Sequence, residues 1–213
     1  MRRSEFEEKD GAIIDAFLAA ASFGFLATHR EPAPGLTPIN FVWFEGHIHF
    51  HGSRIGAKMK DLAADPRASF AVAEETTLVP STLTDPKLAC PATAFFKSVI
   101  VTGVLEAVVD GPGKVRVLEA FMKKLQPEGG YAPFDLADAD YLRNVNGTSV
   151  VRLRTETLSA KFKFGQNKNE ADWTRTAEGL TQRGRPGDLE AVGEMKRLCP
   201  FHRVKDALTG GRN

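Results

Sequence analysis

A β-hairpin whose turn falls at Glu45-Gly46 constrains the fold of this chain more than any other feature of its sequence. The turn pair separates two runs rich in apolar residues. In the returning run, His47–His51, the side chains of Ile48 and Phe50 alternate with three histidines, as in a strand with two different faces. Pro38 in the first run lacks a backbone N–H, so it belongs at a sheet edge or a bulge. We therefore expect antiparallel sheet in this part of the chain.

Other short strands and a few helices flank this hairpin. The periodicity predicts helices that begin after Asp10, after Ser53 and near Val115, with one last helix near Leu189–Met195. Strands are predicted at 25–28, 36–44, 47–51, 68–73, 95–109 and 148–155, and a loop at 76–90. This pattern indicates an α+β fold, a small antiparallel barrel that carries helices. We expect one domain over residues 1–164 and a partly helical C-terminal extension over 165–213 that packs on the barrel or on a dimer mate.

Composition excludes several classes of protein. The 213 residues carry 28 Lys and Arg against 27 Asp and Glu, a net charge of +1, which argues against a nucleic-acid partner. The most apolar stretch, residues 12–28, is interrupted by Asp15, Ser22 and Gly24, and it is too short to span a membrane. Acidic residues follow the N-terminal Met-Arg-Arg where a signal peptide would be apolar. Two cysteines form no disulfide framework, so we expect a reduced cytoplasmic protein.

The segment Phe50–Met59 has the makings of an anion site. A strand runs through Gly52 and Ser53 into a helix that has Lys58 in its first turn. Backbone donors at a helix N-terminus, a hydroxyl and an ammonium together suit a phosphate. The glycine spacing differs from that of a Walker loop. Taken alone, this pattern favours an ordinary strand-to-helix turn with an exposed lysine, because such turns are common.

Two further segments carry unusual residues in strands. Thr37–Trp43 combines bulky apolar residues with Pro38 and Asn40, a surface on which a planar ligand could lie. Taken alone, the segment favours a plain edge strand with aromatic residues in the core. Lys97 and Ser98 interrupt an apolar strand, where they would serve as a second phosphate arm or simply face solvent. The three histidines on one strand are too extended to chelate one ion, and no metal is expected.

In this order, the three segments resemble the FMN-binding split-barrel superfamily related to pyridoxamine 5′-phosphate oxidase, most closely the nitroimidazole-resistance-type flavoproteins. The resemblance covers roughly residues 12–155. It depends on four stretches, Gly24–Thr28, Pro38–Val42, Phe50–Ser53 with Gly56, Lys58 and Asp65-Pro66, and Phe96–Gly103. It implies a six-stranded antiparallel split β-barrel with flanking helices, forming a homodimer with FMN at the subunit interface.

The resemblance also implies which residues hold FMN. The backbone around Pro38 would lie along the flavin ring, and the strand-to-helix segment would surround the phosphate. A short tail segment, 161–167, is similar to one in FMN-binding regulator-like members and would complete the pocket. The implied cofactor-binding residues are Thr37, Pro38, Ile39, Asn40, Phe41, His51, Gly52, Ser53, Lys58, Met59, Phe96, Lys97, Ser98, Lys163 and Gln166.

The leading functional hypothesis is an FMN-dependent oxidoreductase that acts on a small planar substrate. His51 is the candidate catalytic residue, as a proton carrier, and the alternative is that it supports the phosphate. Oxidases proper carry an arginine-rich C-terminal segment for the substrate phosphate, which this sequence does not match. A non-catalytic flavin-binding regulatory or storage module is the second hypothesis, and a haem-binding split barrel is the third.

Overall fold

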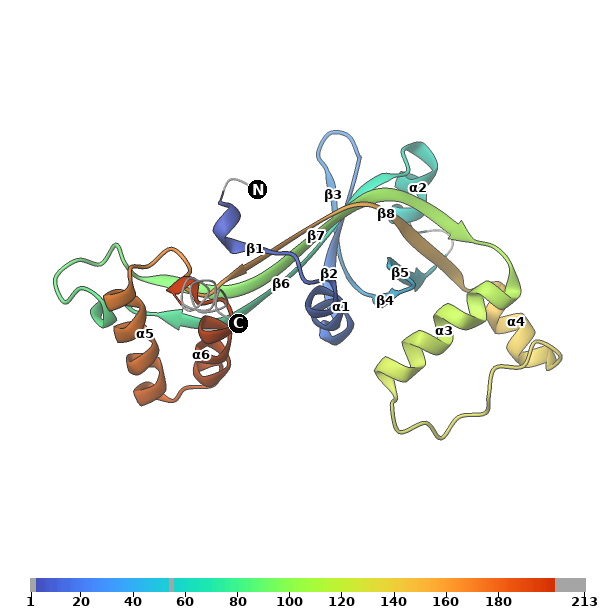
Figure 1. The fold of residues 1–213 in the computed structure, drawn as a ribbon. Helices are drawn as coiled ribbons and strands as arrows, with labels where there is room; N and C mark the ends of the chain where they lie inside the picture. The colour runs from blue at the N-terminus through green and yellow to red at the C-terminus, as the bar shows by residue number, and fades with distance from the viewer. Residues whose placement is uncertain (1–2, 54–55, 202–213) are drawn as a thin grey trace, which may run out of the picture. The chain divides into compact units, whose positions relative to one another are not determined.

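The computed structural model describes residues 3–53 and 56–201, which form eight strands, six α-helices and two 3-10 helices (Figure 1). In this described part of the chain, no helix has both the length and the apolar character that crossing a membrane requires. In chain order, the elements are η1 (Ser4–Phe6), β1 (Glu7–Glu8), α1 (Gly11–Ala20), β2 (Phe23–Thr28), β3 (Gly35–Asn40), β4 (Val42–Phe44), β5 (His47–Gly52), α2 (Ala57–Ala64), β6 (Arg67–Val79), η2 (Ser81–Leu83), β7 (Thr93–Val108), α3 (Gly111–Leu125), α4 (Ala139–Gly147), β8 (Ser149–Lys163), α5 (Glu170–Arg183) and α6 (Asp188–Arg197).

All eight strands belong to one sheet, in the order β3-β2-β6-β7-β8-β5-β4, with β1 paired to β8. The pairings β1–β8, β2–β3, β2–β6, β4–β5 and β5–β8 are antiparallel. The predicted α+β class is confirmed. The predicted number of six strands is wrong for two reasons. The short strand β1 is additional, and the strand expected over 36–44 is interrupted at Phe41, which separates β3 from β4.

The chain forms two compact units. Residues 10–72 and 99–159 make up what we call the sheet unit, and residues 3–9, 73–98 and 160–201 of the described chain make up the helical unit. The long strands β6, β7 and β8 contribute residues to both. The boundary at residue 164, predicted from composition, stays a prediction.

In the sheet unit, the predicted hairpin is confirmed, since β4 and β5 pair across a turn in which Glu45 and Gly46 have φ of 51° and 74°. Ile48 is buried on one face of β5. The opposite face, which carries the histidines, is also partly covered, because Val117 and Phe121 of α3 pack with Val42. His49 is consequently buried as well, with 4% of its surface exposed.

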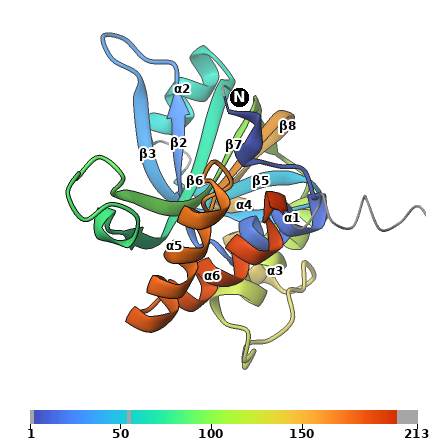
Figure 2. The same ribbon diagram turned by 60° about the vertical axis from the view of Figure 1, so that its left-hand side comes forward.

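In the helical unit, a buried carboxylate joins strand β6 to the last two helices. Asp188 is fully buried and accepts hydrogen bonds from the Thr77 hydroxyl (2.6 Å) and from Arg183 (2.9 Å to Nε). The Arg183 guanidinium, with the Thr77 hydroxyl and a backbone N–H, lowers the pKa of Asp188 to about 2. Figures 1 and 2 both show α5 beside α6 in this unit.

One sequence prediction for this unit is wrong, and one of its helices was not predicted. Residues 76–79 continue β6 instead of starting a loop, because Thr77 and Val79 are buried in alternation with exposed Leu78. Helix α5 was not predicted, because only Thr176, Ala177 and Leu180 are buried in an otherwise polar helix. A narrow stripe of this kind is hard to detect as amphipathic periodicity.

His49 makes the stability of the protein depend on pH. Burial lowers the pKa of His49 to about 4 from its ordinary value of 6.5, although its hydrogen bond to the His47 carbonyl opposes the shift. Between those two values the unfolded chain binds a proton that the folded chain excludes, so the free energy of unfolding falls as the pH falls. We expect a loss of about 3 kcal/mol across this window, measured by urea unfolding. His49→Gln should remove most of this pH dependence of the free energy of unfolding. Replacement of the exposed His29 by Gln should leave the pH dependence in place.

Candidate functional site

Gly52 and Lys58, two of the predicted phosphate residues, lie in contact in the sheet unit. Strand β5 ends at Gly52, and α2 begins five residues later at Ala57. A Cβ atom on Gly52 would stand 2.9 Å from the Lys58 Nζ. The missing side chain therefore leaves room for the ammonium at the end of the strand. We refer to Gly52, Lys58 and the first turn of α2 as the strand-end socket.

A buried carboxylate on the next turn fixes α2 in place. Asp61 is buried and accepts a hydrogen bond of 2.7 Å from the Thr28 hydroxyl on β2. It also accepts from Arg30 Nη2 at 2.5 Å and from Arg30 Nε at 3.1 Å. The Arg30 guanidinium, with the Thr28 hydroxyl, lowers the pKa of Asp61, so this carboxylate stays ionised. The helix that carries Lys58 is thereby attached to β2.

His51 lies beside the socket, one residue before the end of β5. Its ring meets that of Phe121 edge-to-face, with 4.6 Å between the centroids. Burial and the positive charge of Lys58 lower the pKa of His51. At neutral pH the imidazole is therefore mainly neutral, which leaves one ring nitrogen able to accept a proton.

A cavity of about 510 Å³ adjoins Met59, another predicted cofactor residue. The Met59 sulfur lies 3.7 Å from the Ser149 hydroxyl, and Ser149 pairs with Gly52 across β5 and β8. Lys114 lines the cavity, and its ammonium donates to the carbonyls of Val145 and Thr148. Ser53 is exposed at the end of β5.

The predicted flavin-ring segment forms β3 and the residue after it. Pro38 is exposed, Thr37 and Ile39 are half-buried, and the Asn40 amide donates to the Ser22 carbonyl at 3.0 Å. Phe41 is fully buried, and its ring contacts that of Phe70 at 4.9 Å between centroids. Only the backbone of Phe41 is therefore available for the contact that the resemblance implies.

Exposed apolar side chains surround Pro38 on its face of the sheet. Phe25 lies opposite Pro38 in the β2–β3 pairing, and Ala27 lies opposite Leu36. Residues that lie opposite each other share a face of the sheet. The exposed fractions are 57% for Phe23, 45% for Phe25 and 65% for Leu36. We call Phe23, Phe25, Leu36 and Pro38 the apolar face.

The other predicted site residues belong to the helical unit. The Lys97 ammonium pairs with Glu190 at 2.7 Å and with Glu194 at 3.3 Å. Burial lowers the pKa of Lys97, but the two carboxylates outweigh burial and raise it overall. The Ser98 hydroxyl lies 3.5 Å from the Lys161 carbonyl. A cofactor role for Lys97 stays a prediction, and it would require the ammonium to leave both carboxylates.

The tail residues Lys163 and Gln166 differ in how they are engaged. The Gln166 side chain binds its own turn, since it accepts from the Phe164 N–H and donates to the Phe162 carbonyl, both at 2.7 Å. The Lys163 ammonium donates to the Thr93 hydroxyl and lies 5.9 Å from the centre of the Phe96 ring. Lys163 also lines a cavity of its own unit.

The contribution of Asp61 to the site was not foreseen in the sequence. The sequence does show an acidic residue on the same face of the predicted helix as Lys58. It does not show the partner of that residue, because the arginine that pairs with it lies 31 residues earlier. Among residues 3–53 and 56–201, no three His, Cys, Asp or Glu side chains are arranged to hold a metal ion.

Comparison with known proteins identifies the family of this chain. Residues 10–162 match a family model described as pyridoxamine 5′-phosphate oxidase. No curated protein matches the chain.

Several solved structures share the fold. The flavocytochrome Anf3 of Azotobacter vinelandii has a TM-score of 0.64 at 23% identity, covering 79% of this chain and 75% of that one. The FAD- and heme-binding protein of Mycobacterium smegmatis has a TM-score of 0.60 at 16% identity, with 79% of each chain covered. A protein of Bacteroides thetaiotaomicron named for 5-nitroimidazole antibiotic resistance has a TM-score of 0.57 at 17% identity, covering 73% and 85%. At these identities, the likeness concerns the fold alone.

Asp61→Asn tests whether the buried carboxylate holds α2. The amide loses the ionic hydrogen bonds from Arg30, so we expect the free energy of unfolding to fall by about 1–2 kcal/mol in urea titrations. Asp140→Asn is the matched control, because Asp140 pairs with Arg143 and their side chains are 80% and 76% exposed. Exposed pairs contribute about 0–1 kcal/mol. Equal losses in the two variants would contradict the anchoring role of Asp61.

Proposed function

Because the chain belongs to the pyridoxamine 5′-phosphate oxidase family, we propose that it binds FMN and acts as an oxidoreductase on a small planar substrate. The observation that carries the proposal is the strand-end socket, in which the Lys58 ammonium occupies the space that Gly52 leaves beside the end of β5. FMN is proposed ahead of FAD because the socket suits a terminal phosphate.

The donor set of the socket fits a phosphate. A phosphate near charge −2 favours an ammonium together with backbone N–H groups. Gly56 precedes α2 with extended backbone, and no side chain caps the helix there. The first N–H groups of a helix have no partner within it, and the helix dipole adds positive potential at this end. Residues Gly52, Ser53 and Lys58 would hold the phosphate, with His51 beside them.

The flavin ring would lie along the backbone of β3, next to the apolar face. A flavin ring favours apolar surroundings and a few backbone hydrogen bonds. Bound FMN would supply hydride or electron transfer, which protein side chains do not provide. The chain's own residues would orient the ring and exclude water from one side of it.

His51 is the residue proposed to move a proton. Its imidazole is mainly neutral at neutral pH, because burial and Lys58 lower its pKa. A neutral imidazole makes a weaker phosphate ligand than a charged one but can accept a proton from a substrate. The edge-to-face contact with Phe121 limits how the ring can turn. These two properties favour the catalytic role over phosphate support.

A homodimer is proposed through the apolar face. Phe23, Phe25 and Leu36 are each between 45% and 65% exposed on neighbouring strands. Contiguous exposed apolar surface of this kind is typical of protein interfaces. A second copy seated there would also cover the flavin ring that is proposed to lie along Pro38.

The test is FMN binding by the purified protein, followed by flavin absorbance and fluorescence, with a measurement of molecular mass. Lys58→Ala should weaken FMN binding by roughly 2–4 kcal/mol, about 30- to 1000-fold in Kd, because the phosphate loses its ammonium. Lys60→Ala is the matched control, since Lys60 is exposed on the same helix. Its Kd should equal that of the unmodified protein.

Each failure has a separate meaning. Equal Kd values for Lys58→Ala and the unmodified protein would overturn the socket. Tighter binding of FAD than of FMN would overturn the choice of cofactor, and a Soret band would indicate haem instead. A protein that stays colourless and monomeric with added FMN would overturn the whole proposal.

His51→Ala separates the enzyme from a flavin-binding regulatory or storage module. If His51 moves a proton, turnover with NADH or NADPH and a nitroaromatic acceptor should fall about 100-fold or more, with little change in FMN affinity. Loss of FMN affinity with normal turnover of the loaded protein would make His51 a phosphate ligand. An unmodified protein that binds FMN but turns over no acceptor would favour the non-catalytic module.

A further inference from the structure

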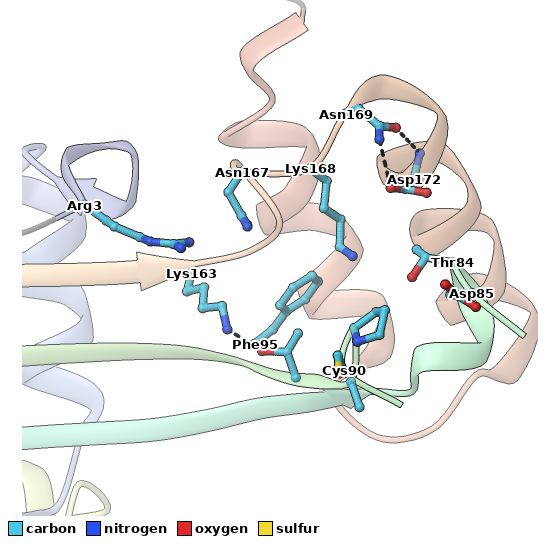
Figure 3. A pocket seen from close by; sticks show the side chains of 13 residues that line it. Arg3, Thr84, Asp85, Cys90, Phe95, Lys163, Asn167, Lys168, Asn169 and Asp172 are labelled. Atoms are coloured by element: carbon cyan, nitrogen blue, oxygen red, sulfur yellow. Dashed lines mark hydrogen bonds between the residues drawn. The ribbon is translucent and has the colours of Figure 1, made fainter. Parts of the chain in front are cut away.

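The helical unit contains a cavity of about 460 Å³ that is lined by three cationic side chains. The cationic side chains come from three segments, namely the residues before η1, the end of β8 and the loop before α5. Figure 3 shows Arg3, Lys163 and Lys168 around this space, with Asn167 between them. Cys90 lines the same cavity and is exposed.

The carboxylates at the cavity are engaged by other groups. Asp85 accepts hydrogen bonds from the N–H groups of Lys87 and Leu88, at 2.8 and 2.9 Å. This carboxylate therefore stabilises its own turn. The hydrogen bonds described for it come from these backbone donors and not from the three cations.

Asp172 is engaged in a similar way at the start of α5. Its carboxylate accepts from the Asn169 amide at 2.9 Å (Figure 3). It also accepts from the Arg175 guanidinium. It raises the pKa of Lys168, but burial outweighs this effect and lowers that pKa overall. The side chains that line the cavity therefore leave an excess of positive charge.

The surroundings of Lys163 disfavour the charged form of its side chain. Burial lowers the pKa of Lys163, and the charges of Lys161, Arg3 and Lys168 lower it further. The only hydrogen bond described for its ammonium is to a neutral group, the Thr93 hydroxyl. Lys97 in the same unit differs, because two carboxylates neutralise it. An anion in the cavity would relieve the repulsion at Lys163 and offset the loss of hydration.

We propose that this cavity binds the oxyanion group, phosphate or carboxylate, of a small molecule. Arg3 would supply a planar pair of N–H donors, Lys163 and Lys168 would supply ammonium donors, and Asn167 would supply an amide. The site does not depend on the strand-end socket, which lies in the other unit. The proposal therefore stands or falls separately from flavin binding at Lys58.

Cys90 reports whether the cavity is occupied. The full-length protein would be alkylated with N-ethylmaleimide at increasing concentrations of inorganic phosphate, at constant ionic strength, with modification of Cys90 followed by mass spectrometry. Cys199 is buried and serves as an internal reference. We expect phosphate to slow the reaction at Cys90 in a saturable way, which gives a Kd for the anion.

Two variants test whether the cations of the cavity cause the protection of Cys90 by phosphate. Lys168→Gln and Arg3→Gln should each raise the phosphate Kd about tenfold, because each removes one ionic hydrogen bond. Lys196→Gln is the control, since it removes one positive charge from an exposed position of α6. An absence of saturable protection, or equal Kd values in all variants, would overturn the proposal.

Two further arms identify the source of the oxyanion. If FMN displaces inorganic phosphate from the cavity and riboflavin does not, the oxyanion is the phosphate of a flavin nucleotide, and the assignment of that phosphate to the strand-end socket would be wrong. If neither displaces it, the ligand is a separate anionic molecule such as a substrate. Failure of FMN to bind at all leaves the phosphate measurement unaffected, so the two proposals fail independently.

Discussion

The buried carboxylate of Asp61 is the constraint on which the candidate site depends. A single ionised group satisfies the Thr28 hydroxyl and the Arg30 guanidinium, and so attaches α2 to the last residue of β2 and to Arg30, two residues beyond it. An ionised carboxylate is stable in a buried position only when hydrogen-bond donors surround it. The position of α2 is therefore set by polar contacts, since Asp61 is its one buried residue. Without this attachment, an eight-residue helix with little apolar surface would have little else to hold it.

The location of Lys58 follows from that attachment. Lys58 precedes Asp61 by three residues, close to one turn of helix, so the two side chains share a side of α2. The same side carries the ammonium to the end of β5, where Gly52 has no side chain to obstruct it. Glycine is suited to position 52 because it lets the ammonium come close to the backbone, and not because the backbone there has a positive φ. The socket thus combines a glycine at a strand end with a helix held by a distant arginine.

The sequence predicted those parts of the structure that depend on neighbouring residues. The hairpin at Glu45-Gly46 and the passage from strand to helix between Gly52 and Lys58 both arise within a few residues, and both are present. The phosphate role of these residues stays a prediction. The partner of Asp61 could not be predicted, because Arg30 is distant in sequence and pairs through the tertiary fold. Burial of His49 was missed for a related reason. Its strand alternates as predicted, but α3, which begins at Gly111 and is distant in sequence, packs on the histidine face.

Lysines on the long strands show why residue type alone does not define a binding site. Lys97 and Lys163 both sit on strands beside phenylalanine rings in the helical unit. Helix α6 places two glutamates at Lys97, which neutralise it, whereas the surroundings of Lys163 add the charges of Arg3 and Lys168. The first arrangement is a structural ion pair, and the second leaves positive charge at a cavity. Because an unbalanced, partly buried charge is costly, the second arrangement is the one that an anionic ligand would stabilise.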